Sequence, residues 1–232
     1  MKVVALVINL IPYHVARWAA VAASGSHEVS VLQLQEQDEF QILETEASRA
    51  PSRVITLRRN PDDVRQLNVI AEMMDVLQSE APDVVVINGY SFPMSLAMLV
   101  AAAKRRVPSV VCSESNKNDF KRQWLTEKIK ERVVRLFGAG LVGGQPQREY
   151  LCELGLACDR VFQGYNAVDN AHFAHGADAA RAIGERLRAE WRLPRRFFIA
   201  VARLTEKKSL DFLVRAFGQF VNGMEGEVFC HW

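Results

Sequence analysis

The 232-residue sequence predicts an α/β fold: a doubly wound, Rossmann-like parallel sheet, followed by the opening βα unit of a second domain of the same kind. Three observations predict it. Short apolar runs alternate with segments of helical period, as in parallel strands joined by crossover helices. Several runs, such as residues 84–87, are apolar throughout, which is typical of strands buried on both faces. The length suits one large domain and part of another, at roughly 150 residues per domain.

Each element is predicted from its own pattern. Strands are expected where short runs are apolar or alternate, and helices where apolar residues recur at intervals of three and four. The expected strands are residues 3–8, 28–34, 54–57, 83–87, 109–112, 140–143 and 161–162. The expected helices are residues 13–23, 62–79, 93–106, 120–137 and 146–154. After residue 165 we expect a connection over 172–178, a charged helix over 179–191, a strand over 197–202 and a helix over 210–221.

Composition excludes several classes of protein. Hydrophobic residues make up 49% and charged residues 24% of the chain, which excludes a disordered, fibrous or low-complexity protein. The longest apolar runs fall well short of the roughly 20 residues that a membrane span needs. The formal net charge of +2 favours no polyanion, so no nucleic-acid partner is expected.

The four cysteines show neither a Cys-x-x-Cys pair nor zinc-like spacing to histidine. We therefore interpret Cys112, Cys152, Cys158 and Cys230 as small core or surface residues, and we expect no metal site. Four thiols in a chain of this length fit a reducing compartment, which is consistent with a cytoplasmic protein.

Function in such sheets lies at the carboxyl ends of the strands. This points to four loops, over residues 9–13, 88–92, 113–119 and 143–145. A literal GxGxxG occurs at residues 138–143, but its first two glycines lie before and at the start of a predicted strand instead of following one. We interpret it as a helix stop and a tight turn, not as a dinucleotide site.

The stretch over residues 117–135 is strongly basic, with seven basic and three acidic residues. The helix predicted there has an apolar stripe made of Leu125, Ile129, Val133 and Leu136. One interpretation is a helix that covers the sheet and presents a solvated basic face. The other is peripheral contact with an anionic membrane or a lipid-linked substrate, to which Trp124 would contribute. The inner membrane face is therefore the alternative to a freely cytoplasmic location.

Three stretches carry motifs at the ends of predicted elements. Residues 202–217 read ARLTEKKSLDFLVRAF, with Arg-Leu, then Glu-Lys, then an apolar helix that contains Ala-Phe. Residues 164–173 read GYNAVDNAHF, and residues 11–18 read IPYHVARW. Together they resemble the retaining, nucleotide-sugar-dependent glycosyltransferases of family 4, whose GT-B architecture joins two Rossmann-like domains.

The resemblance implies a substrate and the residues that hold it. A nucleotide sugar presents a diphosphate leaving group, and no cofactor beyond this substrate is implied. By the resemblance, Arg203 and Lys208 hold the diphosphate and stabilise the charge that develops as the glycosidic bond breaks. The chain departs from the family pattern at Ala202 and Ser209, where the family has glycines.

The resemblance also implies that the N-terminal domain binds a glycan or lipid-linked acceptor. Many relatives place a histidine near the donor sugar after the strand equivalent to residues 109–112, and this chain has Glu114 there. Glu114 is thus the catalytic candidate. The acceptor or cleft candidates are Asn9, Tyr13, His14, Arg17, Asn88 and Tyr90.

The implied domains are residues 1–165 on the acceptor side, 166–195 as a linker with a helix, and 196–232 as an incomplete start of the donor-binding domain. We expect the chain to be inactive alone, because most of that donor domain is missing. Two other functions stay open. One is a non-catalytic module that binds an acceptor or a partner, and the other is a GT-B relative such as a sugar-nucleotide epimerase.

Overall fold

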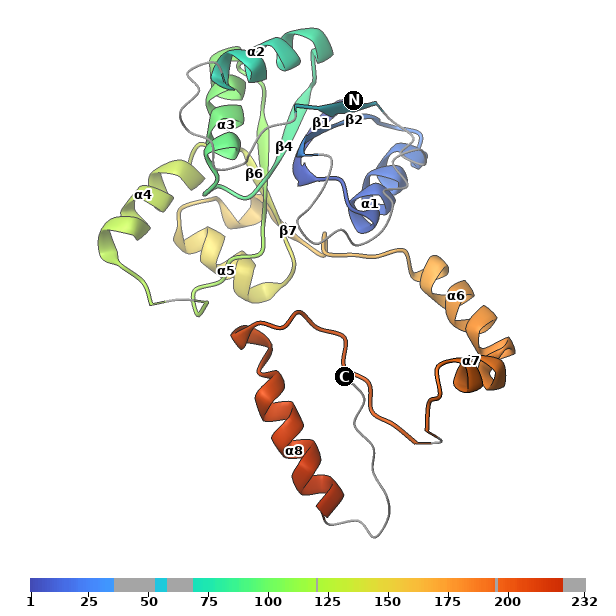
Figure 1. Cartoon of the computed structure of the whole chain (residues 1–232). Helices are drawn as coiled ribbons and strands as arrows, with labels where there is room; N and C mark the ends of the chain where they lie inside the picture. Colours follow the sequence, from blue (N-terminus) through green and yellow to red (C-terminus); the bar gives the residue numbers. More distant parts are fainter. Residues whose placement is uncertain (36–52, 58–68, 120, 195, 223–232) are drawn as a thin grey trace. The chain divides into compact units, whose positions relative to one another are not determined.

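The computed structural model describes residues 1–35, 53–57, 69–119, 121–194 and 196–222 (Figure 1). The chain divides into two compact units, the first being Met1–Asp169 and the second beginning at Asn170. In the described part of the first unit, seven parallel strands form one sheet in the order β3-β2-β1-β4-β5-β6-β7. The predicted doubly wound, Rossmann-like parallel sheet is confirmed.

The elements of the first unit follow the predicted alternation closely. The strands are β1 (Lys2–Asn9), β2 (Glu28–Gln35), β3 (Val54–Thr56), β4 (Val84–Asn88), β5 (Ser109–Ser113), β6 (Ala139–Val142) and β7 (Val161–Gln163). The helices are α1 (Pro12–Ala23), α2 (Val69–Glu80), α3 (Pro93–Arg105), α4 (Trp124–Val134) and α5 (Gln145–Glu153), with a 3₁₀ turn η2 (Cys158–Arg160). The first seven residues of the helix expected over 62–79 lie outside the described residues.

The central strand β1 contributes to two cores, because successive side chains of a strand point to opposite faces of the sheet. Val3, Ala5 and Val7 pack in a core with α1. Val4 and Leu6 pack in a second core, which also takes residues of α2, α3, α4 and α5. The sheet is therefore buried on both faces, as its apolar strands predict.

A buried carboxylate joins α2 to the sheet. Glu80, the last residue of α2, is only 2% exposed. Its Oε2 accepts a hydrogen bond from Ser30 Oγ at 2.7 Å, and its Oε1 accepts one from Arg53 Nη1 at 2.8 Å. The Lys2 ammonium lies 3.7 Å away. Since an unpaired buried charge is strongly destabilising, these partners are what allow Glu80 to be buried at the sheet.

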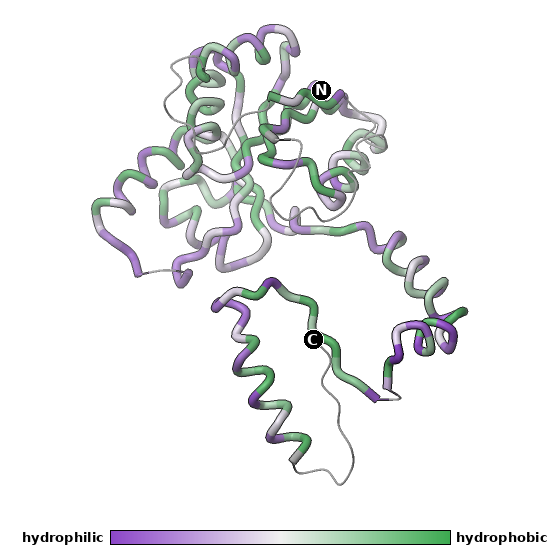
Figure 2. Tube along the Cα trace, viewed as in Figure 1, coloured by the Kyte–Doolittle hydropathy of each residue, from purple (hydrophilic) through white to green (hydrophobic). Residues whose placement is uncertain are grey.

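Helix α4 is shorter than expected and presents its apolar stripe differently. It covers Trp124–Val134 within the predicted range 120–137, of which residue 120 lies outside the described residues. Leu125, Ile129 and Leu136 are each more than half exposed, whereas Val133 packs against the core. Helix α4 accordingly mixes hydrophilic and hydrophobic residues in Figure 2. The interpretation that this stripe covers the sheet was wrong for three of its four residues.

The second unit differs from its prediction in two helices. It contains α6 (Asn170–Ala182), α7 (Gly184–Glu190), a 3₁₀ turn η3 (Glu206–Lys208) and α8 (Leu210–Asn222). The prediction of a connection over 172–178 was wrong, because its alanines have high helix propensity and the helix tolerates Gly176. The helix expected over 179–191 is divided, since α6 ends at Ala182 and α7 begins at Gly184. The helix expected over 210–221 is present as α8.

The strand expected over residues 197–202 is not formed in the structure, where these residues are irregular. A strand needs backbone hydrogen bonds to a neighbouring strand. The described residues of the second unit contain no strand that could supply them. The apolar side chains pack locally instead: the ring of Phe198 lies 5.7 Å from the rings of both Phe217 and Phe220.

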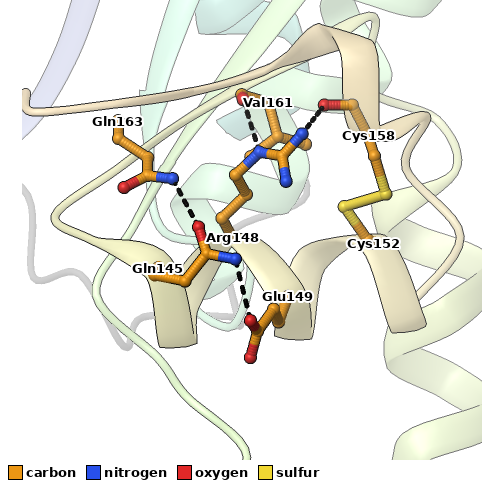
Figure 3. The surroundings of a disulfide bond; sticks show 7 residues. All are labelled: Gln145, Arg148, Glu149, Cys152, Cys158, Val161 and Gln163. Carbon is orange, nitrogen blue, oxygen red and sulfur yellow. Dashed lines mark hydrogen bonds between the residues drawn. A yellow bond between two sulfur atoms is a disulfide. The ribbon is translucent and has the colours of Figure 1, made fainter.

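Two cysteines at the end of α5 are joined in a disulfide (Figure 3). Gly155, with a φ of 98°, turns the chain back after α5, which brings the Cα atoms of Cys152 and Cys158 to 5.3 Å. This separation is within the range of a disulfide. Arg148 holds the returning segment, because its Nη2 donates to the carbonyl oxygen of Cys158 at 2.7 Å and its Nε to that of Val161 at 3.3 Å.

The interpretation of Cys152 and Cys158 as simple core or surface residues therefore missed their pairing. Their spacing matches neither a metal motif nor a redox motif, so only the turn at Gly155 reveals the pairing. Cys112 is buried and unpaired, and Cys230 lies outside the described residues. The disulfide removes the support that four thiols lent to a reducing compartment.

A glycine in β6 tests the packing of α5 on the sheet. A Cβ at Gly140 would lie 3.0 Å from methyl carbons of both Leu151 and Leu156. We expect Gly140→Ala to lower the free energy of unfolding by about 1–3 kcal/mol, because these side chains must shift to admit a methyl group. Chemical denaturation followed by circular dichroism measures this. The matched control is Gly138→Ala, whose Cβ would meet its nearest atom at an ordinary 3.5 Å and which should change stability by less than about 0.5 kcal/mol. Equal effects at the two positions would contradict the prediction.

Candidate functional site

The direction of the crossovers reverses between β1 and β4, which pair in parallel at the middle of the sheet. Ligands of α/β sheets bind outside the carboxyl ends of strands at such a point. Asn9 ends β1 and Asn88 ends β4, so two predicted residues flank it. The side-chain Oδ1 of Asn9 is buried and has no hydrogen-bond partner among the residues that the structure describes. A ligand group that donates a hydrogen bond to this oxygen would relieve a cost of about 1–3 kcal/mol.

Arg17 extends from α1 to the segment that follows β7. Its Nε donates to the carbonyl oxygen of Ala167 at 2.7 Å, and its Nη2 donates to Asn166 Oδ1 at 2.6 Å. The guanidinium carbon lies 4.6 Å from the ring centre of Tyr13 and 5.2 Å from that of Tyr165. Stacking and hydrogen bonding together fix this cation in one orientation.

Glu114, the residue after β5, faces the same segment. Asn166 Nδ2 donates to Glu114 Oε2 at 3.4 Å, and the Tyr165 hydroxyl also forms a hydrogen bond with Glu114. Gly143 lies alongside, and a Cβ there would be only 3.2 Å from Glu114 Oε2. Asn166 therefore joins the two charged residues, since its carbonyl oxygen accepts from Arg17 and its amide donates to Glu114. A carboxylate held in this way can stabilise a positive charge that develops on a bound substrate.

The titratable groups around this cluster are neutral near pH 7. Burial, and after it the positive charge of Arg17, lowers the pKa of His14 to about 4. Burial raises the pKa of Tyr165, and its hydrogen bond with Glu114 adds to this, so the phenol stays protonated. Burial also raises the pKa of Cys112 to about 12, which keeps it a thiol. Arg17 and Glu114 thus supply the charges of the cluster.

Tyr90 belongs to a neighbouring cluster beneath the loop after β5. It is only 5% exposed, burial raises its pKa, and its buried hydroxyl has no hydrogen-bond partner among the residues that the structure describes. Beside it, the Tyr150 hydroxyl donates to Glu127 Oε2 at 2.6 Å, and Lys130 Nζ lies 2.9 Å from Glu127 Oε1. Although burial opposes it, these hydrogen bonds lower the pKa of Glu127. Tyr90 is thus buried beside this second cluster, and its role as an acceptor or cleft residue stays a prediction.

A hollow of about 250 Å³ opens next to this second cluster. The Arg122 guanidinium lies over the Tyr150 ring at 4.6 Å. The hollow combines basic, acidic and aromatic side chains from the loop after β5, α4 and α5: Lys117, Arg122, Trp124, Glu127, Lys128, Glu131, Tyr150, Glu153 and Leu154.

Arg203 and Lys208 belong to the second unit, in the turn that precedes α8. The Thr205 N–H donates to the carbonyl oxygen of Arg203 at 2.8 Å, and the Lys208 N–H donates to that of Thr205 at 2.9 Å. Ser209 follows with a φ of 47°, a conformation that favours glycine. The backbone here thus adopts the conformation expected where the family has glycine. The turn also places Lys208 two residues before the positive end of the α8 dipole.

Within residues 1–35, 53–57, 69–119, 121–194 and 196–222, no cluster of three or more His, Cys, Asp or Glu side chains could hold a metal ion. The helices in the same described residues are all too short or too polar to cross a membrane.

The structure brings several of the predicted residues together. Tyr13, Arg17 and Glu114 meet in one cluster, and the ring of His14 lies 4.4 Å from that of Tyr13. Sequence reasoning missed the residue that connects them, Asn166. It lies in the stretch 164–173 that carried the resemblance, so the motif marked the segment although it did not reveal the contact.

The parallel sheet with its reversal point and charged carboxyl edge defines a doubly wound, Rossmann-like domain. The chain belongs to the glycosyl transferase 4-like domain family, whose model matches residues 11–192. No curated protein sequence matches it.

Solved structures agree on the fold. The structure of Anabaena Alr3699/HepE in complex with UDP-glucose matches with a TM-score of 0.65 and 16% identity, covering 94% of this chain and 57% of that protein. A UDP-GlcNAc 2-epimerase from Neisseria meningitidis bound to UDP-GlcNAc matches with a TM-score of 0.54 and 16% identity, covering 70% and 45%. A UDP-N-acetylglucosamine 2-epimerase from Rickettsia bellii matches with a TM-score of 0.52 and 16% identity, covering 94% and 60%. The chain spans about half the length of these proteins.

The lowered pKa of His14 makes stability depend on pH. Between about 4 and the ordinary 6.5 the unfolded chain binds a proton at His14 that the folded chain does not, so stability rises with pH in this window. We expect acidification from 6.5 to 4 to remove about 2–3 kcal/mol through this residue. In His14→Gln the loss should be smaller by that amount, as measured by urea unfolding at a series of pH values. The control His27→Gln, at the amino-terminal edge of the sheet, should leave the loss in place. An unchanged pH dependence in His14→Gln would contradict the prediction.

Proposed function

We propose that the protein containing this chain transfers a sugar from a nucleotide-sugar donor to a glycan or lipid-linked acceptor, with retention of configuration. The observation that carries the proposal is the cluster of Arg17, Asn166 and Glu114 at the carboxyl edge of the sheet, in a chain of the glycosyl transferase 4-like domain family. The structural match to Anabaena HepE with UDP-glucose supports a nucleotide sugar as the donor class. The nucleotide sugar is a substrate, and the proposal includes no cofactor or metal.

Glu114 is the proposed catalytic residue. In the transfer, the bond between the anomeric carbon and the diphosphate oxygen breaks, the acceptor hydroxyl oxygen bonds to the same carbon, and the hydroxyl proton passes to the departing diphosphate. Positive charge develops on the sugar ring as the first bond breaks. A carboxylate already oriented by Tyr165 and Asn166 stabilises that charge with little reorganisation.

Arg203 and Lys208 are the proposed diphosphate ligands. The negative charge that builds up on the leaving group is matched by a guanidinium, which can bind two phosphate oxygens, and by an ammonium. The positive end of the α8 dipole adds to the same field. This places the proposed donor-phosphate residues in the second unit and the proposed catalytic carboxylate in the first.

The acceptor is proposed to bind at the carboxyl edge of the first unit. The structure supports Asn9, Tyr13 and Arg17 there, with the neutral His14 as a hydrogen-bonding group. Asn88 lies at the same edge, and Tyr90 supports the loop after β5 from below.

We propose residues 1–165 as the acceptor-side domain, 166–195 as the linker and 196–232 as the start of the donor-binding domain. The proposed location is cytoplasmic, with peripheral contact at the inner membrane face through residues 117–135.

A nucleotide-sugar epimerase is the second candidate, favoured by the matches to UDP-GlcNAc 2-epimerases. The two reactions differ in their products. Transfer releases a nucleoside diphosphate and needs an acceptor, whereas epimerisation keeps the nucleotide sugar intact and needs none. NMR of a UDP-GlcNAc incubation without acceptor therefore separates them. Donor or acceptor binding without any turnover would favour the non-catalytic module.

Removal of the proposed phosphate ligands tests the donor site. We expect Arg203→Ala and Lys208→Ala each to weaken binding of a nucleoside diphosphate sugar by about 10- to 100-fold, since each removes charge-assisted hydrogen bonds to phosphate. Isothermal titration calorimetry with UDP-glucose and UDP-GlcNAc measures this in the active protein that contains this chain. Arg215→Ala, which removes an exposed cation of α8 paired with Asp211, is the control and should bind normally. If all three variants bind alike, the assignment is wrong.

Neutralising Glu114 tests the catalytic role. In the same active protein we expect Glu114→Gln to lower kcat by roughly 100-fold, while KM for the donor changes little, because the carboxylate acts on charge that exists only in the transition state. Release of nucleoside diphosphate measures the rate. Glu149→Gln, an exposed carboxylate on α5, serves as the matched control and should keep normal turnover. A wild-type kcat in Glu114→Gln would exclude Glu114 as the catalytic residue.

A further inference from the structure

The two cysteines that pair at the end of α5 are brought together by the backbone around them. The Gly155 N–H donates to the carbonyl oxygen of Cys152 at 2.9 Å, and the Leu156 N–H donates to that of Leu151 at 3.1 Å. Leu151 and Leu156 are both buried in the core. Because hydrogen bonds and apolar burial hold this turn, Cys152 and Cys158 stay close to each other whether or not their sulfur atoms are bonded.

The pair is also open to solvent. Cys158 is exposed and Cys152 is partly exposed, whereas the unpaired Cys112 is only 5% exposed. Thiol–disulfide exchange begins when a thiolate attacks a sulfur atom that it can reach, so exposed disulfides are the labile and regulatory ones. A small thiol can therefore reach the bond between Cys152 and Cys158 from solvent.

The chain that follows Cys158 leads directly to the cluster at the carboxyl edge of the sheet. β7 begins three residues later and, in the described part of the sheet, pairs only with β6, so it is an edge strand of three residues. Tyr165 and Asn166, which come soon after β7, form hydrogen bonds with Glu114. The disulfide and the two hydrogen bonds of Arg148 tie the entrance of this short strand to α5 (Figure 3).

We propose that Cys152 and Cys158 form a reversible redox switch, set by a small-molecule thiol–disulfide couple such as glutathione, which controls how firmly the segment after β7 is held at the cluster. When the bond is closed, the entrance of β7 is covalently tied to α5. When the bond is open, the hydrogen bonds of Arg148 remain, and the short edge strand with its following segment opens more often.

A reversible pair reconciles the disulfide with the proposed cytoplasmic location. Disulfides of cytosolic proteins are usually transient, and they are either catalytic or redox-sensing. The two cysteines have five residues between them, unlike the Cys-x-x-Cys motif of thiol oxidoreductases. Regulation is therefore favoured over a catalytic redox role.

Closure of the pair consumes one glutathione disulfide and releases two molecules of glutathione. The Cys158 thiolate attacks one sulfur of glutathione disulfide and expels a glutathione thiolate. The Cys152 thiolate then attacks the Cys158 sulfur of this mixed disulfide, forms the bond between the cysteines and expels the second glutathione thiolate. Two electrons pass from the cysteine sulfurs to glutathione, and the two protons lost by the cysteines end on the two glutathione thiols. The reverse sequence opens the bond.

Equilibration of the 232-residue chain with glutathione buffers tests the switch. The buffers range from a large excess of reduced glutathione to equal amounts of both forms, free thiols are trapped by alkylation, and mass spectrometry of peptides measures the label at each cysteine. We expect Cys152 and Cys158 to change together from reduced to oxidised within this series. Cys230→Ser, which alters a cysteine outside the pair, should respond like the unaltered chain. A pair that stays oxidised throughout, or one that stays reduced throughout, would overturn the proposal.

Hydrogen–deuterium exchange of the same chain tests the effect on the segment after β7. Opening the bond should speed amide exchange in residues 161–167 about tenfold, because a cross-link at the entrance of the strand is lost. Residues 2–9 of the central strand β1 are the internal control and should exchange alike in both states. Cys152→Ser with Cys158→Ser should match the reduced chain at every glutathione ratio, with far-UV circular dichroism to check its fold. Equal exchange of residues 161–167 in the oxidised and reduced unaltered chain would contradict the proposal, whatever the variant does.

The consequence for turnover rests on the proposed function. Since Tyr165 and Asn166 orient Glu114, opening the bond should lower kcat of the active protein several-fold. Release of nucleoside diphosphate at the two extremes of the glutathione series measures this. Unchanged turnover, together with faster exchange of residues 161–167, would count against the catalytic role of Glu114 and not against the switch.

Discussion

Parallel pairing of β1 with both β2 and β4 is the constraint on which the rest of the first unit depends. A parallel connection requires a crossover, so α1, α2 and α3 must pass over the faces of the sheet and bury both sides of β1. From β1 the strand order runs outward through β2 and β3 on one side and through β4 to β7 on the other. The carboxyl ends of β1 and β4 are therefore not covered by a connecting helix. Asn9, whose side-chain oxygen has no partner among the described residues, Arg17 in the middle of α1 and Glu114 after β5 are all placed at this edge by the same pairing.

The sequence allowed prediction of the site wherever a residue's role follows from its place at the end of a strand. Asn9, Asn88 and Glu114 end or follow predicted strands, and their position at one edge follows from parallel pairing alone. The connection through Asn166 could not be predicted in this way. Asn166 contacts Arg17, which precedes it by 149 positions, and Glu114, which precedes it by 52 positions. Both contacts depend on how the segment after β7 crosses the edge of the sheet. The pairing of Cys152 with Cys158 was missed for the same reason, since it depends on a backbone turn and not on a spacing rule.

Elements whose conformation depends on an absent neighbour were the ones predicted least well. Residues 197–202 have the composition of a buried strand, but a strand forms only when another strand accepts its hydrogen bonds. The side of α4 that bears Leu125 and Ile129 has the period of a buried helix face, yet Val134 and Phe137 already fill the contact with the core. In both cases the local pattern indicates side chains that favour burial, although these side chains are exposed in the described part of the chain.

The charges of the first unit indicate why a transferase of this kind would need both units. Arg17 is engaged by Asn166, Ala167 and two aromatic rings, and burial, with the charge of Arg17, keeps the neighbouring His14 neutral. Among the described residues of this cluster, the carboxyl edge thus offers one fixed cation, Arg17, and one fixed carboxylate, Glu114. Such an edge is suited to hydroxyl groups and to a developing positive charge, and it does not supply the several cations that a diphosphate requires. The proposed diphosphate ligands, Arg203 and Lys208, lie in the second unit. The chain segment between the two sets begins at Tyr165–Ala167, which Arg17 and Glu114 hold directly. A change at Asn166 would therefore disturb the carboxylate and the start of the connection to the donor-phosphate residues together.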